Sequence, residues 1–505
     1  MDGSPGVVEV LSERERRFER VRRRAGVFAA PAVFLLLILL PMPGLSGSAH
    51  RLAAVMGTVM VLWITEALPM PVSALLGVTA CVVLDVAPPK EAFAPFADPL
   101  MFLFIGSFVL ARAIFVHGLD RRFAFYVLSL PWVGARPSRI LLAFGAVTAF
   151  LSAWISNTAT TAMMFAIGMS ILGFLFDAEN EGGATVSRRY ATGLMLMTSF
   201  AASVGGLATP IGTPPNLIGL GFIQQLTGTR LTFFQWTILG VPIVLCLFAY
   251  LFFCLDRLNP AGVREVDGVG RMLRRERERL GPWTRGQRST LLAFAVTVML
   301  WVVPGALALL AGEASPLYLE VSRRLPEGAA ALLGASLLFV LPGDSGRRAL
   351  SWEQAARIDW GVILLYGGGF ALGVLSFGTG LAEALGRSLT GMLPFEGGLG
   401  LLFASTLAAT ILSETTSNTA SANMIVPVVI AIAKASGSDP LEPALGATMG
   451  ASLGFMLPVS TPCNAIVYGS GYVPLSRMIR YGALLDLAGV CVVTGFVRLL
   501  LPILR

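Results

Sequence analysis

Long apolar segments alternate with short polar connections along almost the whole chain. Windows of about 18–25 apolar residues are long enough to cross a bilayer as helices. Guided by that rule we predict roughly eleven crossings, at residues 26–45, 51–68, 72–88, 99–117, 188–223, 235–256, 289–311, 329–342, 360–381, 440–473 and 479–503. Two further apolar stretches, 138–176 and 397–434, are each long enough for two short helices. The pattern predicts an all-α polytopic membrane protein with transmembrane helices and two re-entrant hairpins.

Polar, helix-breaking sequence interrupts the apolar pattern at four places. Ser156-Asn157-Thr158 lies in the first predicted hairpin and Ser417-Asn418-Thr419 in the second. Each hairpin is followed by a Gly/Pro-broken stretch that ends in Asn, ATPIGTPPN (208–216) and PVSTPCN (458–464). Such sequence is tolerated at membrane depth only inside protein or along a cavity. Paired interruptions in two halves of a chain indicate the binding site of a transporter.

The interruptions belong to an internal repeat. LFIGSFVLARAI (103–114) precedes the first hairpin and LLYGGGFALGVL (364–375) precedes the second. Phe108 and Phe370 are 262 residues apart and Ser156 and Ser417 are 261 apart, so the register holds. An odd number of predicted crossings separates the two copies, so they are inverted. Inverted repeats place a site near the bilayer midplane and provide two oppositely facing states.

Composition and charge set the location and the topology. The chain has 505 residues, of which 55% are hydrophobic and 13% charged, against roughly 25% charged in a soluble domain. Arginines gather in residues 1–25 and 257–288, which the positive-inside rule places in the cytoplasm. We therefore predict a multi-pass protein of the cell inner (plasma) membrane with a cytoplasmic N-terminus and no cleavable signal. Acidic residues interleave with the basic ones in 257–288, and no aromatic stacking pattern accompanies them, so nucleic-acid binding is not predicted.

The motifs supply hydroxyls, carboxamides and freed backbone carbonyls but no Lys or Arg. These oxygens suit a small hard cation, whereas helix N-termini at the same places suit an anion. Ser and Asn are also good N-caps, so capping alone is an alternative for a single serine. A bound dianion needs compensating charge in a pocket of low dielectric, and bound cations are the natural source.

Other chemistry finds little support. The sequence has no His/carboxylate cluster, no HExxH motif and no convincing nucleophile–base pair, so an enzyme is not predicted. Glu414 adjoins the second motif and offers a proton site or a structural anchor. Glu66 precedes two prolines and fits a scaffold role as well as a functional one. Arg112 is expected to reach the membrane interface or to pair with a carboxylate.

At these residues the chain resembles the divalent anion/sodium symporter (DASS) family, which contains bacterial sodium-coupled dicarboxylate transporters. The resemblance covers most of residues 26–503 and rests on five motifs. They are WITEALP (63–69), SAWISNTATTAMM (152–164), GTPPN (212–216), SETTSNTASANMIVP (413–427) and ASLGFMLPVSTPCNAIV (451–467).

The resemblance implies a homodimer that works by an elevator mechanism, in which a scaffold holds the dimer and a transport domain carries the site. We place the cytoplasmic arm at 1–25, the scaffold at 26–135 and 289–395, the transport domain at 136–256 and 396–505, and the cytoplasmic loop at 257–288. The connections at about 118–131 and 382–393 would link the two parts.

The resemblance also implies a set of ligands. The first sodium site would use Ser152, Ser156, Asn157 and the Gly212 carbonyl. The second would use Ser413, Thr416, Asn418 and the Ser460 carbonyl. Substrate carboxylates would meet Asn157, Thr158, Thr213, Asn418, Thr419, Thr461 and Pro462. Position 413 is Ser where the family usually has Thr, and Ser421 stands where SNTAT would continue.

The expected activity is sodium-coupled symport of C4-dicarboxylates such as succinate, malate and fumarate, with sodium as the coupling ion and the lipid bilayer as the environment. A dicarboxylate exchanger and a sulfate carrier of the same fold remain alternatives. A cation/proton antiporter of related architecture is a weaker one, because only Glu414 could titrate near a hairpin.

Overall fold

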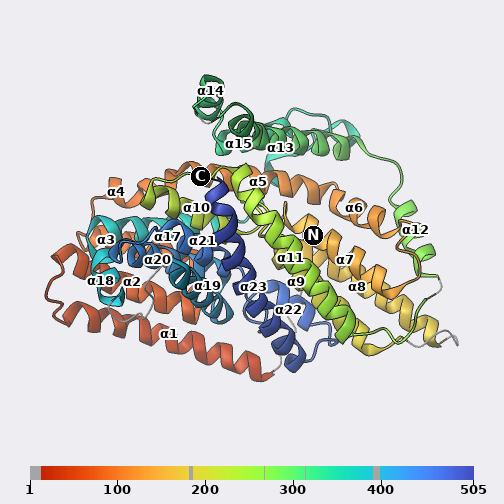
Figure 1. The fold of residues 1–505 in the computed structure, drawn as a ribbon, viewed down its shortest axis with the longest axis horizontal. Coiled ribbons are helices and arrows are strands. Elements are labelled where there is room, and N and C mark those ends of the chain that lie inside the picture. The colour runs from red at the N-terminus through yellow and green to blue at the C-terminus, as the bar shows by residue number, and fades with distance from the viewer. Residues whose placement is uncertain (1–12, 181–185, 267, 313, 391–397, 505) are drawn as a thin grey trace.

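The protein is a bundle of helices (Figure 1). The structure is a computed structural model and describes residues 13–180, 186–266, 268–312, 314–390 and 398–504. The first twelve residues of the predicted arm and the predicted domain boundary at 395 lie outside these ranges. The first half forms α1 (Glu13–Leu39), α2 (Gly47–Thr65), α3 (Met70–Val83), α4 (Pro89–Phe93), the 3-10 turn η1 (Ala94–Ala97), α5 (Pro99–Val116), α6 (Leu119–Leu128), α7 (Pro137–Ser152), α8 (Asn157–Asn180), α9 (Arg188–Gly205), α10 (Pro214–Thr227) and α11 (Phe233–Leu258).

The second half continues in the same way. It forms α12 (Val269–Arg279), α13 (Arg285–Ala311), α14 (Pro316–Arg324), α15 (Glu327–Leu337), η2 (Asp344–Gly346), α16 (Trp352–Ala355), α17 (Trp360–Gly378), α18 (Leu381–Thr390), α19 (Gly398–Thr415), α20 (Asn418–Ala435), α21 (Leu441–Gly450), α22 (Pro462–Tyr468) and α23 (Leu475–Leu504). All named elements of the described ranges are helical, as predicted.

Nine helices of the described ranges are long and apolar enough to cross a membrane. They include α8, α19 and α20, which the sequence analysis assigns to hairpins. The re-entrant path and the number of crossings therefore stay predictions. The predicted spans at 188–223 and 440–473 each contain two helices, broken at the Gly/Pro stretches as expected. The spans predicted at 72–88 and 329–342 give helices of only 14 and 11 residues.

The repeat predicted from sequence is visible in how the helices begin. Asp98 and Asp359 each cap a helix, and each Oδ1 accepts a backbone N–H, from Leu100 at 2.8 Å and from Val362 at 3.2 Å. The two caps are 359 − 98 = 261 residues apart, the same offset as Ser156 and Ser417. The connections after α5 and α17 both form helices of 10 residues, α6 and α18.

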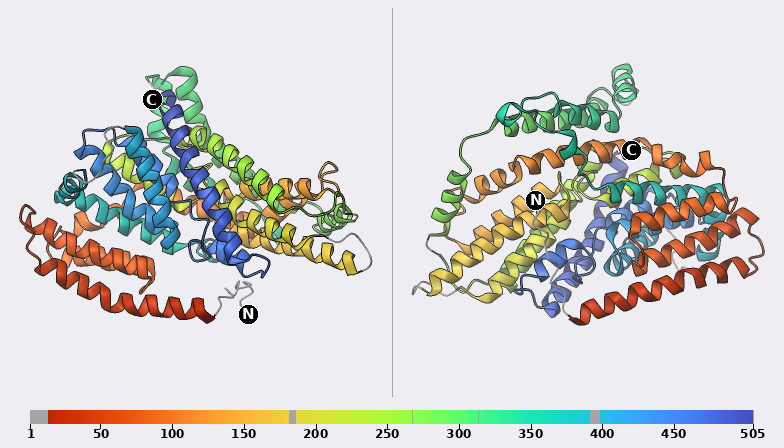
Figure 2. Two further views of the ribbon diagram at one scale, coloured as in Figure 1. Left: turned by 60° about the horizontal axis from the view of Figure 1, so that its bottom comes forward. Right: turned by 180° about the vertical axis from the view of Figure 1, so that it is seen from behind.

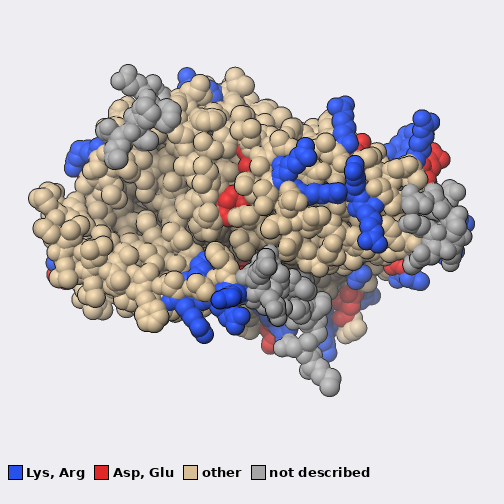
Figure 3. All heavy atoms as spheres, turned by 90° about the horizontal axis from the view of Figure 1, so that it is seen from below, with Lys and Arg blue, Asp and Glu red and all other residues tan. Residues whose placement is uncertain are grey.

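The helices that carry the motifs lie in the middle of the molecule. The α1–α2 pair packs at one edge and α13–α15 at the opposite edge (Figures 1 and 2). Between them, α9 packs on α22 and α10 packs on α20, so the broken helix of each repeat contacts elements of the other repeat. Charged side chains gather in separate groups on a largely uncharged surface (Figure 3). A wide uncharged surface of this kind is what a lipid-facing protein presents.

Candidate functional site

The two SNT tripeptides form matching tips between paired helices. Ser156 follows α7, and its Oγ accepts the N–H of Ala159 at 3.3 Å as α8 begins. Ser417 does the same for α20, accepting the N–H of Ala420 at 3.2 Å. Both serines therefore act as N-caps, so the capping alternative describes their hydroxyls well. The following Asn and Thr residues start the helices and leave their side chains to other partners.

Four oxygens converge beside the first tip. The Oδ1 position of Asn157 lies 2.7 Å from Ser152 Oγ, 3.2 Å from the Ala202 carbonyl and 3.3 Å from the Gly212 carbonyl. Oxygens that only accept hydrogen bonds repel one another when they lie this close. Two arrangements remove the conflict: the Asn157 amide turns its NH₂ group toward the carbonyls, or a cation binds among the oxygens. Hydroxyl, carboxamide and carbonyl oxygens are ligands of hard cations. The residues present therefore fit the predicted sodium ligands Ser152, Asn157 and Gly212.

A related cluster lies beside the second tip. Ser413 Oγ is 2.8 Å from Asn418 Oδ1 and 2.7 Å from the Ala451 carbonyl. A hydroxyl has one proton to donate, so three oxygens share a single hydrogen. Thr416 is buried, but its Oγ1 donates to the Ser417 carbonyl at 3.3 Å, so no bond joins it to the cluster. No group of three or more His, Cys, Asp or Glu residues in the described part of the chain could hold a metal.

Two asparagines hold the broken helices in shape. Asn216 Nδ2 donates to the carbonyls of Gly206 and Thr209, ten and seven residues earlier. Asn464 Nδ2 donates to Gly454 and Leu457 at the same two spacings. These bonds tie carbonyls between the two helices of each broken span to the first turn of the second helix. The terminal Asn of TPPN and TPCN is therefore a backbone clamp, and neither asparagine lines the cavity described next.

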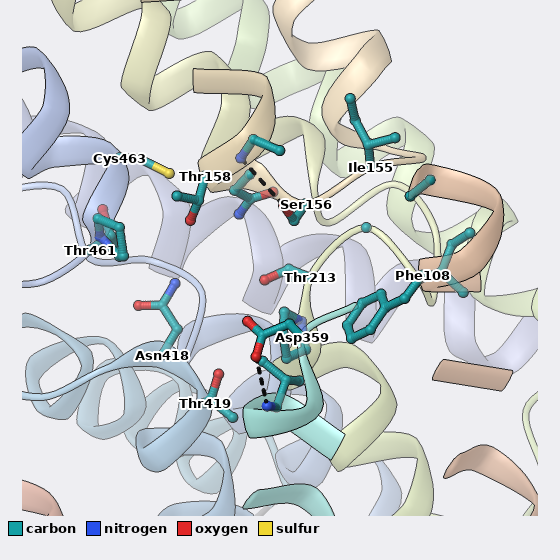
Figure 4. Close-up of a pocket in the computed structure, with 18 of the residues that line it drawn as sticks. Phe108, Ile155, Ser156, Thr158, Thr213, Asp359, Asn418, Thr419, Thr461 and Cys463 are labelled. Atoms are coloured by element: carbon teal, nitrogen blue, oxygen red, sulfur yellow. Dashed lines mark hydrogen bonds between the residues drawn. The ribbon is translucent and has the colours of Figure 1, made fainter. Parts of the chain in front are cut away.

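A cavity of about 620 Å³ lies between the tips. Figure 4 shows Thr158, Thr213, Asn418 and Thr419 around this space. All seven residues predicted to meet substrate line it, together with Ser156, Gly212 and Ser460 of the predicted sodium ligands; the seven are Asn157, Thr158, Thr213, Asn418, Thr419, Thr461 and Pro462. The other predicted sodium ligands, Ser152, Ser413 and Thr416, lie outside the lining and are buried.

Another part of the lining comes from α5 and from the start of α17 and the connection before it. It is formed by Phe108, Ala111, Arg112, Phe115, Arg357, Ile358, Asp359 and Val362. Figure 4 shows Phe108 and Asp359 on this side. Neither arginine was predicted from sequence to line the binding site. We call this set the α5–α17 wall.

Comparison with known proteins identifies the family. A model described as the sodium:sulfate symporter transmembrane region matches residues 22–504. The chain belongs to the divalent anion/sodium symporter family. It is 30% identical over 497 residues to the sodium-dependent dicarboxylate transporter SdcS of Staphylococcus saprophyticus, covering 97% of this chain and 94% of that protein. It is 31% identical over 490 residues to SdcS of Staphylococcus aureus strain bovine RF122, covering 95% and 91%.

Two solved structures have a similar fold. The YdaH transporter of Alcanivorax borkumensis aligns with a TM-score of 0.53 at 12% identity and covers 96% of this chain and 98% of its own. MtrF of Neisseria gonorrhoeae aligns with a TM-score of 0.53 at 14% identity, covering 94% and 97%. The family match and the curated relatives, together with the apolar helices of the described ranges, show a multi-pass secondary transporter of this family and not an enzyme.

Within this family fold, the two acidic residues singled out from sequence are both anchors. Glu414 accepts the N–H groups of Met456 at 2.7 Å and Leu457 at 3.2 Å and the hydroxyl of Ser460 at 2.6 Å. It therefore fastens the second broken-helix loop to the tip. Glu66, in a left-handed conformation with φ of 49° at the end of α2, pairs with Arg22 at 2.9 Å and holds α1.

Three groups at or beside the site were not found from the sequence. The Ala202 carbonyl lies in an apolar helix, and nothing in the sequence distinguishes it from other carbonyls. Arg357 lies in a polar connection, where an arginine is common. Asp486 is a buried carboxyl in α23 with Glu414 as its charged neighbour, and a lone acid in a long apolar segment was a signal that sequence reasoning could have used.

Proposed function

We propose that the protein is a sodium-coupled symporter of C4-dicarboxylates such as succinate, malate and fumarate. The observation that carries this proposal is the pair of oxygen clusters, one per repeat, on either side of one cavity. Each cluster offers hydroxyl, carboxamide and carbonyl oxygens, which suit sodium. The relatives named sodium-dependent dicarboxylate transporters support the choice of ion and substrate.

The cavity also suits a dianion. The helices α8, α10 and α20 all begin at its wall, at Asn157, Pro214 and Asn418. Helix N-termini carry free N–H groups and partial positive charge, which favour carboxylates. The sodium ions would be held by Ser152, Asn157 and Gly212 and by Ser413, Asn418 and Ser460, and they would add positive charge next to the substrate.

We further propose that the protein is a homodimer of the inner (plasma) membrane with a cytoplasmic N-terminus. The arginine distribution supports the orientation, and the family resemblance supports the dimer. The scaffold would comprise 26–135 and 289–395, and the transport domain 136–256 and 396–505. A bifunctional crosslinker that joins the α7–α8 tip to α5 should then stop transport, whereas one joining the two tips should be tolerated.

Uptake into proteoliposomes tests the function. Labelled succinate should accumulate with an inward sodium gradient and fall to the background rate without one. Labelled sulfate and internal succinate test the two alternatives, because a sulfate carrier accumulates sulfate and an exchanger needs internal succinate but no sodium gradient. Accumulation that ignores sodium would refute the symport proposal.

Alanine substitutions test the site. Asn157→Ala or Asn418→Ala removes an oxygen ligand without adding bulk, so uptake should drop to background while the protein still assembles. Gln224→Ala is the matched control, because it removes an exposed amide of α10 outside the cavity lining. Near-normal uptake by Asn157→Ala at low sodium would show that the site assignment is wrong.

A further inference from the structure

Two arginines contribute to the lining of the cavity between the tips. Arg112 lies on α5, one turn before the helix ends at Val116, and Arg357 lies in the connection before α17. Both line the same cavity as Asn157 and Asn418. They are the positive side chains of a lining in which the motifs themselves provide none.

Neither guanidinium has a protein partner within the described residues. Arg112 is half-buried and its Nε is buried without a hydrogen bond, whereas Arg357 is exposed. No ion pair joins Arg112 or Arg357 to a carboxylate of the described chain, whereas Arg22, Arg136 and Arg230 each pair with a glutamate. The acid in the lining is Asp359, whose Oδ1 is engaged with the N–H of Val362.

An unpaired guanidinium on the wall of a cavity favours an anionic partner. For Arg112, leaving the buried Nε unsatisfied is costly, and for both arginines the planar guanidinium matches a carboxylate with two parallel hydrogen bonds. When the helix N-termini bind one carboxylate of a dicarboxylate, its second carboxylate still needs hydrogen-bond donors. The α5–α17 wall lines the same cavity as those N-termini.

The two arginines break the symmetry of the repeats. With the offset of 261 residues that relates the helix caps Asp98 and Asp359, Arg112 corresponds to Gly373 (112 + 261) and Arg357 to Phe96 (357 − 261). Both counterparts are uncharged; Gly373 is buried and packs against Phe222, and Phe96 is partly buried and packs against Gly367. The inverted repeat therefore does not generate a second arginine pair at the other end of the transport path.

We propose that Arg112 and Arg357 form an anion-binding vestibule on the cytoplasmic side, which determines dicarboxylate affinity at that face alone. The inference rests on the proposed function and topology, in which α5 ends and α17 begins at the cytoplasmic side. Both arginines belong to the proposed scaffold, whereas the tips belong to the moving part. The substrate therefore contacts the arginines in the inward-open state and leaves them when the site moves outward.

Membrane vesicles of both orientations test this asymmetry. Sodium-driven succinate uptake is measured in inverted vesicles, which expose the cytoplasmic face, and in right-side-out vesicles. Arg112→Gln and Arg357→Gln should each raise the KM for succinate about tenfold in inverted vesicles, and both should leave the KM of right-side-out vesicles unchanged. The matched control is Arg347→Gln, which removes an exposed arginine of the same predicted face outside the cavity lining.

Two further measurements separate binding from structure. Arg112→Lys and Arg357→Lys keep the charge and should recover much of the inner affinity. High salt, which screens charges, should weaken the inner affinity of the wild type more than that of the double variant. A structural defect would instead change both orientations equally.

The outcomes are distinct. If the wild type takes up succinate but the double Gln variant has an unchanged inner KM, or equal changes at both faces, the vestibule is refuted and the proposed function stands. If the wild type shows no sodium-driven succinate uptake in either orientation, the proposed function fails and the vestibule falls with it.

Discussion

Gly206→Ala is the sharpest test of the first cation site. A Cβ built on Gly206 lies 2.4 Å from Asn157 Oδ1 and 3.1 Å from its Cγ. Gly206 has φ of −59° and ψ of −19°, an ordinary right-handed conformation that alanine adopts freely. The substitution therefore acts on the Asn157 side chain and not on the backbone.

The size of the effect follows from the distance. Real Cβ atoms are not found closer than 3.0 Å, so the amide must move by at least 3.0 − 2.4 = 0.6 Å. Oxygen ligands of hard cations sit at about 2.4 Å, so this shift is roughly a quarter of a coordination distance. Overpacking of this kind costs about 1–3 kcal/mol. Without a cation, the Asn157 amide can move away from the new methyl group; binding sodium would force it back against the methyl. The cost of overpacking then falls on binding, and sodium affinity falls about 5–150-fold.

The sodium dependence of succinate uptake in proteoliposomes measures this change, with thermal unfolding in sodium-free buffer to detect any general damage. The repeat provides a graded control: at Gly454 the Cβ meets Ser413 atoms at 3.1 Å and Asn418 Oδ1 at 3.5 Å, so Gly454→Ala should have a smaller effect. Gly173→Ala adds a methyl to open space and should change nothing. An unchanged half-saturating sodium concentration in Gly206→Ala would refute the assignment of Asn157 as a cation ligand.

Two further predictions concern acidic residues outside the cavity lining. Glu414→Gln replaces one acceptor with a donor that faces backbone N–H groups, so it should cost about 1–3 kcal/mol and lower both the unfolding temperature and uptake; a change only in the pH profile of uptake would instead indicate proton coupling. Burial raises the pKa of Asp120 to about 6, above about 3.9 in the unfolded chain, so Asp120 favours the fold at low pH and this contribution is lost as pH rises from about 4 to 6. Asp120→Asn should therefore raise the unfolding temperature at pH 7.5 and leave it unchanged near pH 4, and equal shifts at both pH values would contradict that account.

The sequence alone was sufficient to predict the features that occur in both repeats. The offset of 261 residues between the two SNT motifs also relates Asp98 to Asp359, which were not used to find it. The seven substrate residues assigned by resemblance line one cavity. Helix-breaking Gly and Pro act on the chain within a few residues, and so their effect is readable from sequence.

Long-range geometry was not readable in the same way. Arg112 was expected to pair with a carboxylate or reach the interface, and in the structure no carboxylate of the described chain pairs with it. Which residues face Asn157 depends on how α5 and α17 pack against the tips, a contact between segments separated widely in sequence. Helix length was also missed at α3 and α15, because apolar composition continues past the point where the helix ends.

The differences between the repeats matter more for function than their likeness. Two perfectly equivalent repeats would give the inward and outward states equal affinities for the same substrate. Here the clamps differ, since Asn464 Oδ1 accepts the hydroxyl of Ser199 at 2.6 Å while Asn216 Oδ1 is buried without a partner in the described chain. The walls differ too, through Arg112 and Arg357. A transporter driven by a sodium gradient benefits when the state that binds sodium and substrate has a different affinity from the state that releases them. The residues at which the two repeats differ can produce such a difference between the two states.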